Sequence, residues 1–262
     1  MPTRLTHDLL DERPFPGGGR RIALRFGRDG DAERVPGLLL LPDAAGAGCP
    51  APGAVLLHGY SSRKEDMAEL VGRGLLRHGI ASLAIDLPLH GERRGDVDFR
   101  SVRNPLALTQ AWRRALADGK LALGYLGARP EVDAGRLALT GYSMGSFLGV
   151  QVAADSPVVR ALVLAAGGDL PAGTPVDRLI RAVADPLKAV RRFARPLLMV
   201  HGRRDGTVRP DQAQRLFDAA GGPKALRWYD AGHYLPASVI DDAATWLAAQ
   251  LRDVGAAHAR SA

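Results

Sequence analysis

From about Gly53 onward, short apolar runs alternate with longer stretches whose apolar positions recur at helical spacing. The apolar runs lie near 54–57, 80–86, 136–140, 158–166, 196–200 and 225–229. The intervening stretches predict helices near 64–78, 105–127, 146–154 and 176–193, one that Pro210 begins, and a closing helix near 238–251. Apolar runs without strict alternation are typical of strands that are buried on both faces. The pattern therefore predicts a mostly parallel sheet with helices on both sides.

The first part of the chain has a different pattern. Segment 1–19 ends in prolines and glycines, so we expect no regular structure before about Arg20. Two strand-like runs, 21–26 and 35–42, flank a glycine-containing turn and predict an antiparallel hairpin. Because proline cannot donate to a strand ladder, Pro36 should lie near the start or at the edge of its strand. With the later runs, we expect a twisted open sheet of about eight strands.

Length and composition favour a single domain. The 262 residues, 46% of them hydrophobic, suffice for one large α/β domain and are few for two. We expect an N-terminal extension over 1–19, one α/β domain over 20–254, and a frayed tail over 255–262. The N-terminus has no apolar secretion core, and no apolar run approaches the ~18 residues that span a bilayer. We therefore expect a cytoplasmic protein with no membrane partner.

Charge and cysteine content bear on several functions. The net charge is +7, but the arginines are scattered and form no basic run interleaved with aromatic residues. We therefore expect no nucleic-acid partner. Cys49 is the single cysteine, which excludes an intrachain disulfide and a cysteine metal cluster. We expect neither a metal nor another cofactor, and the sequence leaves open whether the protein is a monomer or a homodimer.

Residues 141–145, Gly-Tyr-Ser-Met-Gly, lie between an apolar run and a predicted helix. A serine between a strand and a helix in a G-x-S-x-G pattern indicates a nucleophile elbow, a sharp turn that holds the hydroxyl clear of the sheet. Side chains at Gly141 or Gly145 would collide with the neighbouring strand or helix. An ordinary β-to-α turn is the alternative, which the rest of the chain must decide.

A serine nucleophile needs a histidine base that a carboxylate orients. In an α/β sheet with such an elbow, the chain order is serine, acid, histidine. After Ser143 the histidines are His201, His233 and His258. His258 lies in the predicted tail, and His201 repeats the strand-end His-Gly of residues 58–59, which favours a structural role. His233 is therefore the predicted base.

Asp205 is the predicted acid. Of the eight aspartates between Ser143 and His233, most fall on or near predicted helices. Asp169 lies in a glycine-rich turn, and Asp230 is too near His233 to come from a separate strand. Asp205 alone follows a strand by a short loop, although a plain turn residue is the alternative.

The tetrahedral intermediate needs two backbone donors for its oxyanion. In this architecture one comes from the residue after the nucleophile and the other from the loop after an earlier strand. These donors are predicted to be the N–H groups of Met144 and Tyr60. The preceding His58-Gly59 supplies the turn that directs the second donor inward.

Four motifs carry a resemblance to the α/β-hydrolases over about 22–251. They are L-L-H-G-Y at 56–60, D-L-P-L-H-G at 86–91, G-Y-S-M-G at 141–145, and H-G-R-R-D-G with G-H-Y at 201–206 and 232–234. The chain is most similar to small serine esterases and dienelactone-hydrolase-like proteins, which are related to prolyl-oligopeptidase-type catalytic domains. Dienelactone hydrolases themselves carry a cysteine where this chain has Ser143, and a lipase-type H-G-G-G is absent. We interpret Asp86 and His90 as loop scaffolding.

Together these features predict a cofactor-free serine hydrolase that cleaves small carboxylic esters through an acyl-enzyme. An amidase or exopeptidase with the same triad, and a noncatalytic binding protein, are the alternatives. The intact triad residues argue against the last. The connection 167–195 is too short for a large cap, which favours short acyl chains. Four arginines flank the predicted site: Arg93, Arg94, Arg203 and Arg204. They could favour a polar or anionic substrate, and the alternative is that they simply face solvent.

Overall fold

A single sheet forms the centre of the computed structural model, which describes residues 4–94, 105–171, 181–182 and 184–258. In this part of the chain the sheet has nine strands, in the order β1-β2-β3-β5-β4-β6-β7-β8-β9. Strand β3 is antiparallel to its neighbours β2 and β5, and all pairs from β5 to β9 are parallel. The mostly parallel sheet with an N-terminal antiparallel hairpin is thereby confirmed. The bounds are β1 Leu5–Pro14, β2 Arg20–Arg28, β3 Val35–Leu41, β4 Ala51–Leu57, β5 Ala81–Ile85, β6 Val132–Tyr142, β7 Val159–Ala165, β8 Leu197–Gly202 and β9 Lys224–Tyr229.

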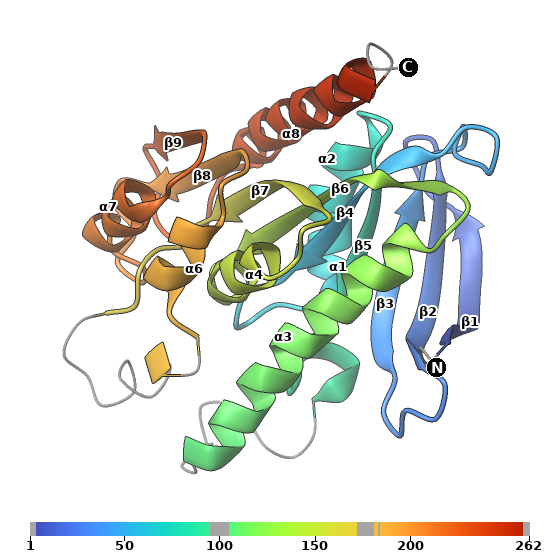
Figure 1. Cartoon of the computed structure of the whole chain (residues 1–262), viewed down its shortest axis with the longest axis horizontal. Coiled ribbons are helices and arrows are strands. Elements are labelled where there is room, and N and C mark those ends of the chain that lie inside the picture. The colour runs from blue at the N-terminus through green and yellow to red at the C-terminus, as the bar shows by residue number, and fades with distance from the viewer. Residues whose placement is uncertain (1–3, 95–104, 172–180, 183, 259–262) are drawn as a thin grey trace.

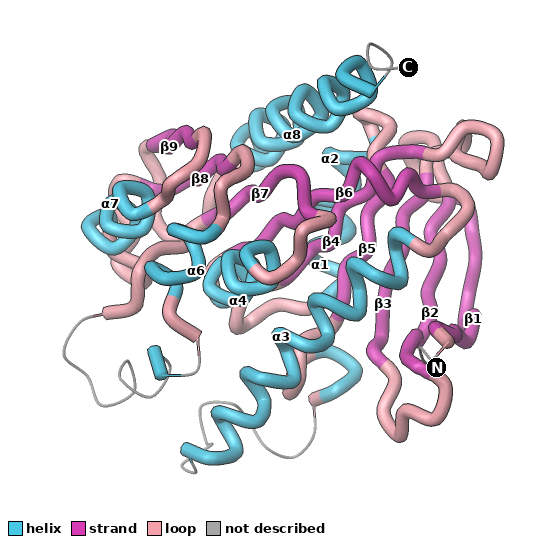
Figure 2. The backbone as a smooth tube through the Cα atoms, viewed as in Figure 1, coloured by secondary structure: helices cyan, strands magenta, loops and turns pink. Residues whose placement is uncertain are grey.

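Helices cover both faces of the sheet (Figures 1 and 2). One face carries a continuous helical segment and the last helix: α1 Lys64–Met67, the π-helix η1 Ala68–Gly72, α2 Arg73–Leu76 and α8 Ala237–His258. The other face carries α3 Pro105–Gly127, α4 Met144–Ala154, α6 Pro186–Arg192 and α7 Pro210–Ala219. A short 3-10 helix, η2 Gly91–Arg93, follows β5. No helix in the described ranges is long and apolar enough to cross a membrane.

The central strands are buried on both faces, which explains their continuous apolar runs. Every residue of β3 is buried. Leu38 and Leu40 pack in the core on the α8 side, whereas Leu39 and Leu41 pack on the α4 side. This is the two-residue alternation of a strand, here with an apolar layer on each side. Pro36 is the second residue of β3, near its start as predicted.

The structure corrects the expectation for residues 1–19. Leu5–Pro14 forms β1, which pairs antiparallel with β2 at the sheet edge and brings the described strands to nine rather than eight. Most β1 side chains are exposed, so the segment lacks the apolar alternation that marks a half-buried strand. Backbone pairing holds it, with ion pairs from Arg20 to Glu12, Arg21 to Asp11 and Arg34 to Asp8.

Two predictions near the end of the chain fall partly outside the described residues. Of the predicted helix near 176–193, the structure describes α6, where Asp185 caps the start by accepting the N–H groups of Leu187 and Lys188. Positions 172–180 and 183 lie outside the described residues, as do 259–262 of the predicted tail. Helix α8 continues through His258, beyond the expected domain boundary at Gly255.

Candidate active site

Ser143 lies on a sharp turn between β6 and α4. Its backbone has a positive φ of 50° with ψ at −115°, a conformation that non-glycine residues rarely adopt. A Cβ at Gly141 would overlap the carbonyl oxygen of Gly145, and a Cβ at Gly145 would overlap that of Leu57. The predicted steric role of both glycines is confirmed. The Ser143 N–H donates to the Ala165 carbonyl at 2.9 Å, which ties the turn to β7.

The structure brings together the three side chains that the motif order selected. His233, between β9 and α8, accepts a hydrogen bond at Nε2 from the Ser143 hydroxyl, with 2.9 Å between Nε2 and Oγ. Its Nδ1 donates to Asp205 Oδ2 at 2.8 Å. Asp205 follows β8 and is buried, whereas His233 is half-buried. Because an ionised carboxylate only accepts hydrogen bonds, Nδ1 carries the proton and Nε2 is free to accept one.

The carboxylate of Asp205 is held by its own loop. Its Oδ1 accepts the N–H groups of Thr207 at 2.8 Å and Val208 at 3.0 Å, so that Oδ2 is directed at His233. His201 is buried and makes a 2.9 Å hydrogen bond from Nε2 to the Val208 carbonyl. Burial lowers the pKa of His201. These contacts agree with the structural role that the sequence favoured for this histidine.

Both predicted oxyanion donors lie beside the serine. Met144 is the first residue of α4, so its amide is among the N–H groups that open this helix. Tyr60 follows Gly59, where a Cβ would lie only 3.3 Å from the Ser143 Cβ. The loop after β4 therefore passes close over the serine. The roles of Tyr60 and Met144 as donors stay predictions.

His58 fixes this loop against the one after β5. It is fully buried; Nδ1 donates to the Gly59 carbonyl at 2.7 Å, and Nε2 accepts the Leu87 N–H at 3.0 Å. A neutral imidazole satisfies both contacts, and a charged one would lose the second. Burial lowers the pKa of His58 to about 4.

We expect stability to depend on the protonation of His58. Since its folded pKa lies below the ordinary value of 6.5, the unfolded chain binds more protons between pH 6.5 and about 4. The contribution is fully present above pH 6.5 and is lost as pH falls toward 4, by about 3 kcal/mol in total. Urea unfolding of the wild type and of His58→Gln, whose amide oxygen can still accept from Leu87, measures the difference. The wild type should lose more unfolding free energy between pH 7 and 4, and parallel pH profiles would contradict this expectation.

An ion cluster that the sequence did not indicate holds the loop after β5. Asp86 is buried and accepts the Lys64 N–H at 2.9 Å, the Lys64 Nζ at 2.8 Å and the Glu92 N–H at 3.0 Å. Burial alone would lower the pKa of Lys64, but hydrogen bonds to Asp86, Glu65 and Glu92 raise it above its ordinary value. These contacts agree with the interpretation of Asp86 as scaffolding. Lys64 gave no signal, because a lysine at a helix start resembles any solvated charge.

Tyr142 is a second residue whose role the sequence did not indicate. Its hydroxyl donates to the His233 carbonyl at 2.7 Å and accepts the Leu235 N–H at 3.1 Å. The side chain thus anchors the backbone of the loop that carries the histidine. Burial raises the pKa of Tyr142, which keeps the donating hydroxyl protonated. No motif marks the residue, because this position of G-x-S-x-G accepts many side chains.

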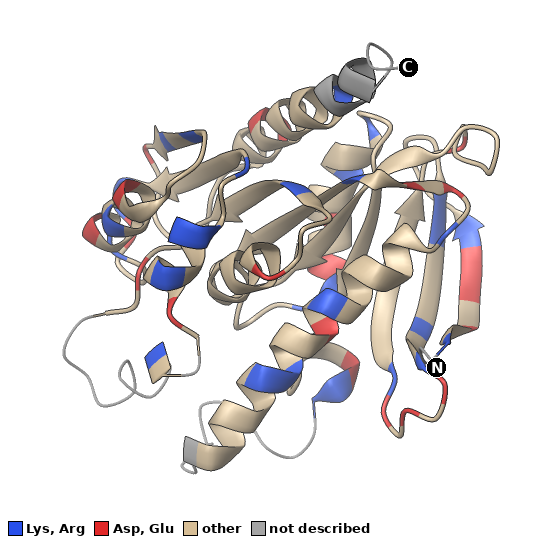
Figure 3. Cartoon of the chain, in the orientation of Figure 1, with Lys and Arg blue, Asp and Glu red and all other residues tan. Residues whose placement is uncertain are grey.

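Three of the four flanking arginines are engaged within the protein. Figure 3 shows that basic and acidic residues are interspersed along the described part of the chain rather than gathered in one place. Arg93 is only 5% exposed and is held by two carboxylates. For Arg93, these contacts favour scaffolding over recognition of an anionic substrate, whereas Arg203 and Arg204 are exposed to solvent. The pairs are Arg93 with Asp118 at 2.6 Å and Glu33 at 2.7 Å, Arg204 with Asp230 at 2.6 Å, and the Arg203 guanidinium 5.8 Å from the centre of the Trp228 ring.

Comparison with known proteins identifies the family. No curated relative matches the sequence. Among solved structures, an acetyl xylan esterase from Paenibacillus sp. R4 is 20% identical with a TM-score of 0.74, over 95% of this chain and 89% of that one. An S-formylglutathione hydrolase from Agrobacterium tumefaciens is 17% identical with a TM-score of 0.74, over 93% of this chain and 99% of that one. These similarities confirm the α/β-hydrolase fold that the motifs implied. Because the sequence matches the dienelactone hydrolase family over residues 35–237, the chain belongs to that family and is a carboxylic ester hydrolase.

Proposed function

We propose that the protein is a serine esterase that cleaves small carboxylic esters with short acyl chains. Ser143 is the nucleophile, His233 the base, and Asp205 the acid that orients the histidine. The observation that carries the proposal is the unbroken series of hydrogen bonds from Ser143 Oγ to His233 at 2.9 Å and from His233 to Asp205 at 2.8 Å. Ser143 itself lies on a strained turn at the carboxyl end of the parallel strand β6, where the side chains of a catalytic site gather in this kind of sheet.

In the first half of the reaction, Ser143 Oγ attacks the ester carbonyl carbon as its proton moves to His233 Nε2. The carbonyl π electrons move to the oxygen, and the N–H groups of Tyr60 and Met144 donate to the resulting oxyanion. When the oxyanion reforms the carbonyl, the bond from carbon to the alcohol oxygen breaks. That oxygen takes the proton from His233 Nε2, so an alcohol leaves and an acyl-serine remains.

Water completes the second half. His233 takes one water proton as the water oxygen attacks the acyl carbon, and Ser143 Oγ then leaves with that proton. The products are a carboxylic acid and the free enzyme. Throughout, Asp205 stays ionised, keeps the proton of the neutral imidazole on Nδ1 and stabilises the imidazolium that forms in each half.

The space beside Met144 supports a small acyl group. On the α4 side of the serine, the described residues leave a cavity of about 10 Å³. That is close to the least volume that holds one water molecule. An acyl chain that leaves the reacting carbon on this side has room for little more than a methyl group unless the site rearranges. The residues around this space are Leu87, Pro88, His90, Ala111, Trp112, Ala115, Met144 and Leu148.

We expect kcat/KM to be highest for acetyl to butyryl esters and to fall for acyl chains of about eight carbons or more. A longer acyl chain gains only the energy of those methylenes that a protein surface covers, and the small cavity on the α4 side can cover few of them. A series of p-nitrophenyl esters below their solubility limits measures the preference. A maximum at decanoate would contradict it.

The same assay distinguishes the alternative functions. If the protein hydrolyses aminoacyl anilides faster than any ester, it is an amidase or exopeptidase instead. Failure of a fluorophosphonate probe to label the protein, together with no turnover of either substrate class, would leave a noncatalytic binding protein on this fold.

A further inference from the structure

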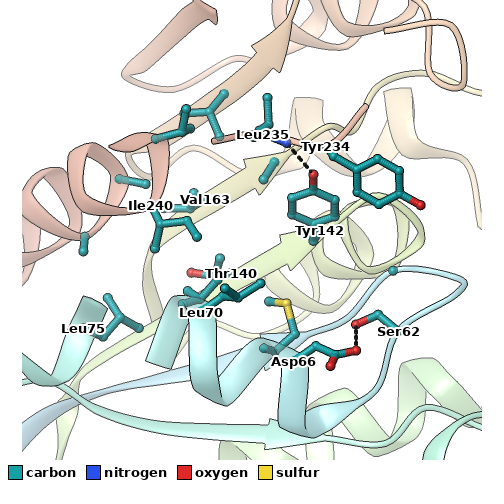
Figure 4. Close-up of a pocket in the computed structure, with 18 of the residues that line it drawn as sticks. Ser62, Asp66, Leu70, Leu75, Thr140, Tyr142, Val163, Tyr234, Leu235 and Ile240 are labelled. Carbon is teal, nitrogen blue, oxygen red and sulfur yellow. Dashed lines mark hydrogen bonds between the residues drawn. The ribbon is translucent and has the colours of Figure 1, made fainter. Parts of the chain in front are cut away.

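A larger cavity lies on the other face of the sheet from the small one. Its volume is about 290 Å³, and it lies between the segment α1–η1–α2 and helix α8. Strands β6, β7 and β8 contribute Thr140, Val163 and Val200 to it. Leu70 and Ile240 line it from the two helical walls, as Figure 4 shows. The walls are mainly aliphatic, which suits an apolar ligand.

The exposed side chains at this cavity also indicate an apolar ligand. Leu70 is 58% exposed and Tyr234 is 82% exposed, although both line the cavity. Large apolar side chains that remain exposed beside a cavity are typical of binding sites. Two polar side chains of the lining hydrogen-bond to each other, since Ser62 Oγ donates to Asp66 Oδ2 at 2.8 Å. This pair needs no ligand to satisfy it.

One end of the cavity reaches the triad. Gly59 and Tyr142 line it, and a Cβ on Gly59 would lie 3.3 Å from the Ser143 Cβ. Tyr234 directly follows His233, and the centres of the two rings are 5.8 Å apart. Figure 4 shows Tyr142 and Tyr234 side by side at this end. A group attached to the reacting carbon can therefore extend from the serine into the cavity.

The direction of proton transfer indicates which part of the ester, acyl or alcohol, the large cavity binds. His233 Nε2 must protonate the alcohol oxygen as it leaves, so the alcohol part lies on the His233 side of the reacting carbon. Tyr234 and Leu235, which follow His233, line the large cavity, whereas Met144, which follows Ser143, lines the small one. We infer that the large cavity binds the apolar alcohol part of the substrate. The substrates are then short-chain acyl esters of apolar alcohols, an inference that rests on the proposed function.

The volume limits the size of that alcohol. An apolar cavity of about 150 Å³ accommodates a benzene ring. The cavity here is about twice as large. It therefore has room for an alkyl or aryl-alkyl group of roughly ten carbons.

A series of n-alkyl acetates from ethyl to decyl, followed by the release of acetic acid, tests the inference. We expect kcat/KM to rise two- to fourfold per methylene up to about the octyl ester, the ratio given by burial of a methylene group. Hydrolysis of ethyl acetate with a flat response to alcohol length would overturn the inference alone. Hydrolysis of no ester would overturn the proposed function as well.

Variants of α8 locate the effect. Ala243→Phe places a ring in the cavity and should lower the octyl-to-ethyl ratio of kcat/KM by about 50-fold. Thr245→Phe is the control, because it adds the same ring to the exposed side of the helix and should leave the ratio unchanged. Ile240→Ala enlarges the cavity and should move the optimum to longer alcohols, which keeps the test decisive if Ala243→Phe does not fold. An unchanged ratio in both cavity variants would overturn the inference.

Discussion

Replacement of Ser143 by alanine should lower kcat for p-nitrophenyl acetate by about 10⁴-fold or more, because the attacking oxygen is removed. The fold should persist. Alanine removes only the hydroxyl that hydrogen-bonds to His233, and it keeps the Cβ that the strained turn already accommodates. Steady-state kinetics and far-ultraviolet circular dichroism measure the two effects.

The labelling control for this prediction uses a second serine. Fluorophosphonate should label the wild type and Ser238→Ala, which removes an exposed serine of α8, but not Ser143→Ala. Retention of most activity in Ser143→Ala with unchanged circular dichroism would show that another group is the nucleophile.

His233→Ala and Asp205→Asn should each lower kcat by about 10⁴-fold, and the double variant should be little slower than the worse single one. The two side chains act as a unit, since the carboxylate works only through the imidazole that it orients. Asparagine keeps an oxygen for the Thr207 and Val208 N–H groups, so the loop should stay in place. Single-turnover kinetics of all three variants measures the coupling.

Asp230→Asn is the matched control, because this exposed aspartate lies on the same loop as the histidine and pairs with Arg204. It should retain activity within about twofold, as expected for an exposed ion pair. Multiplicative losses in the His233 and Asp205 double variant would mean that the two residues act independently, contrary to a triad.

The sequence was most informative where function depends on local turn chemistry and on the order of strands. The elbow glycines at 141 and 145 can be recognised because only glycine fits where backbone passes so closely. Asp205 and His233 can be selected because parallel strands bring their following loops to one edge of the sheet. Both arguments need only the chain order of motifs.

Other features depend on contacts that no local pattern encodes. Strand β1 is polar and mostly exposed, so its sequence resembles a loop, and only its pairing with β2 makes it a strand. The salt bridge between Lys64 and Asp86 joins residues from different parts of the chain, and their spacing in the sequence does not predict that they meet. The large cavity lies between helices from opposite ends of the chain, so its volume depends on how they pack.

The π-helix η1 indicates where related chains can differ in length by one residue. Ala68, Gly72 and Leu76 are all buried at intervals of four residues, although such a row drifts by about 40° per step in a regular α-helix. A turn closed by i→i+5 bonds holds one more residue and corrects the drift. This turn is therefore equivalent to a one-residue insertion within a helix. If a relative lacks that residue, the gap in the alignment belongs inside this helix, and a gap placed outside it would misalign every later position of α2 by one residue, or about 100° around the helix axis.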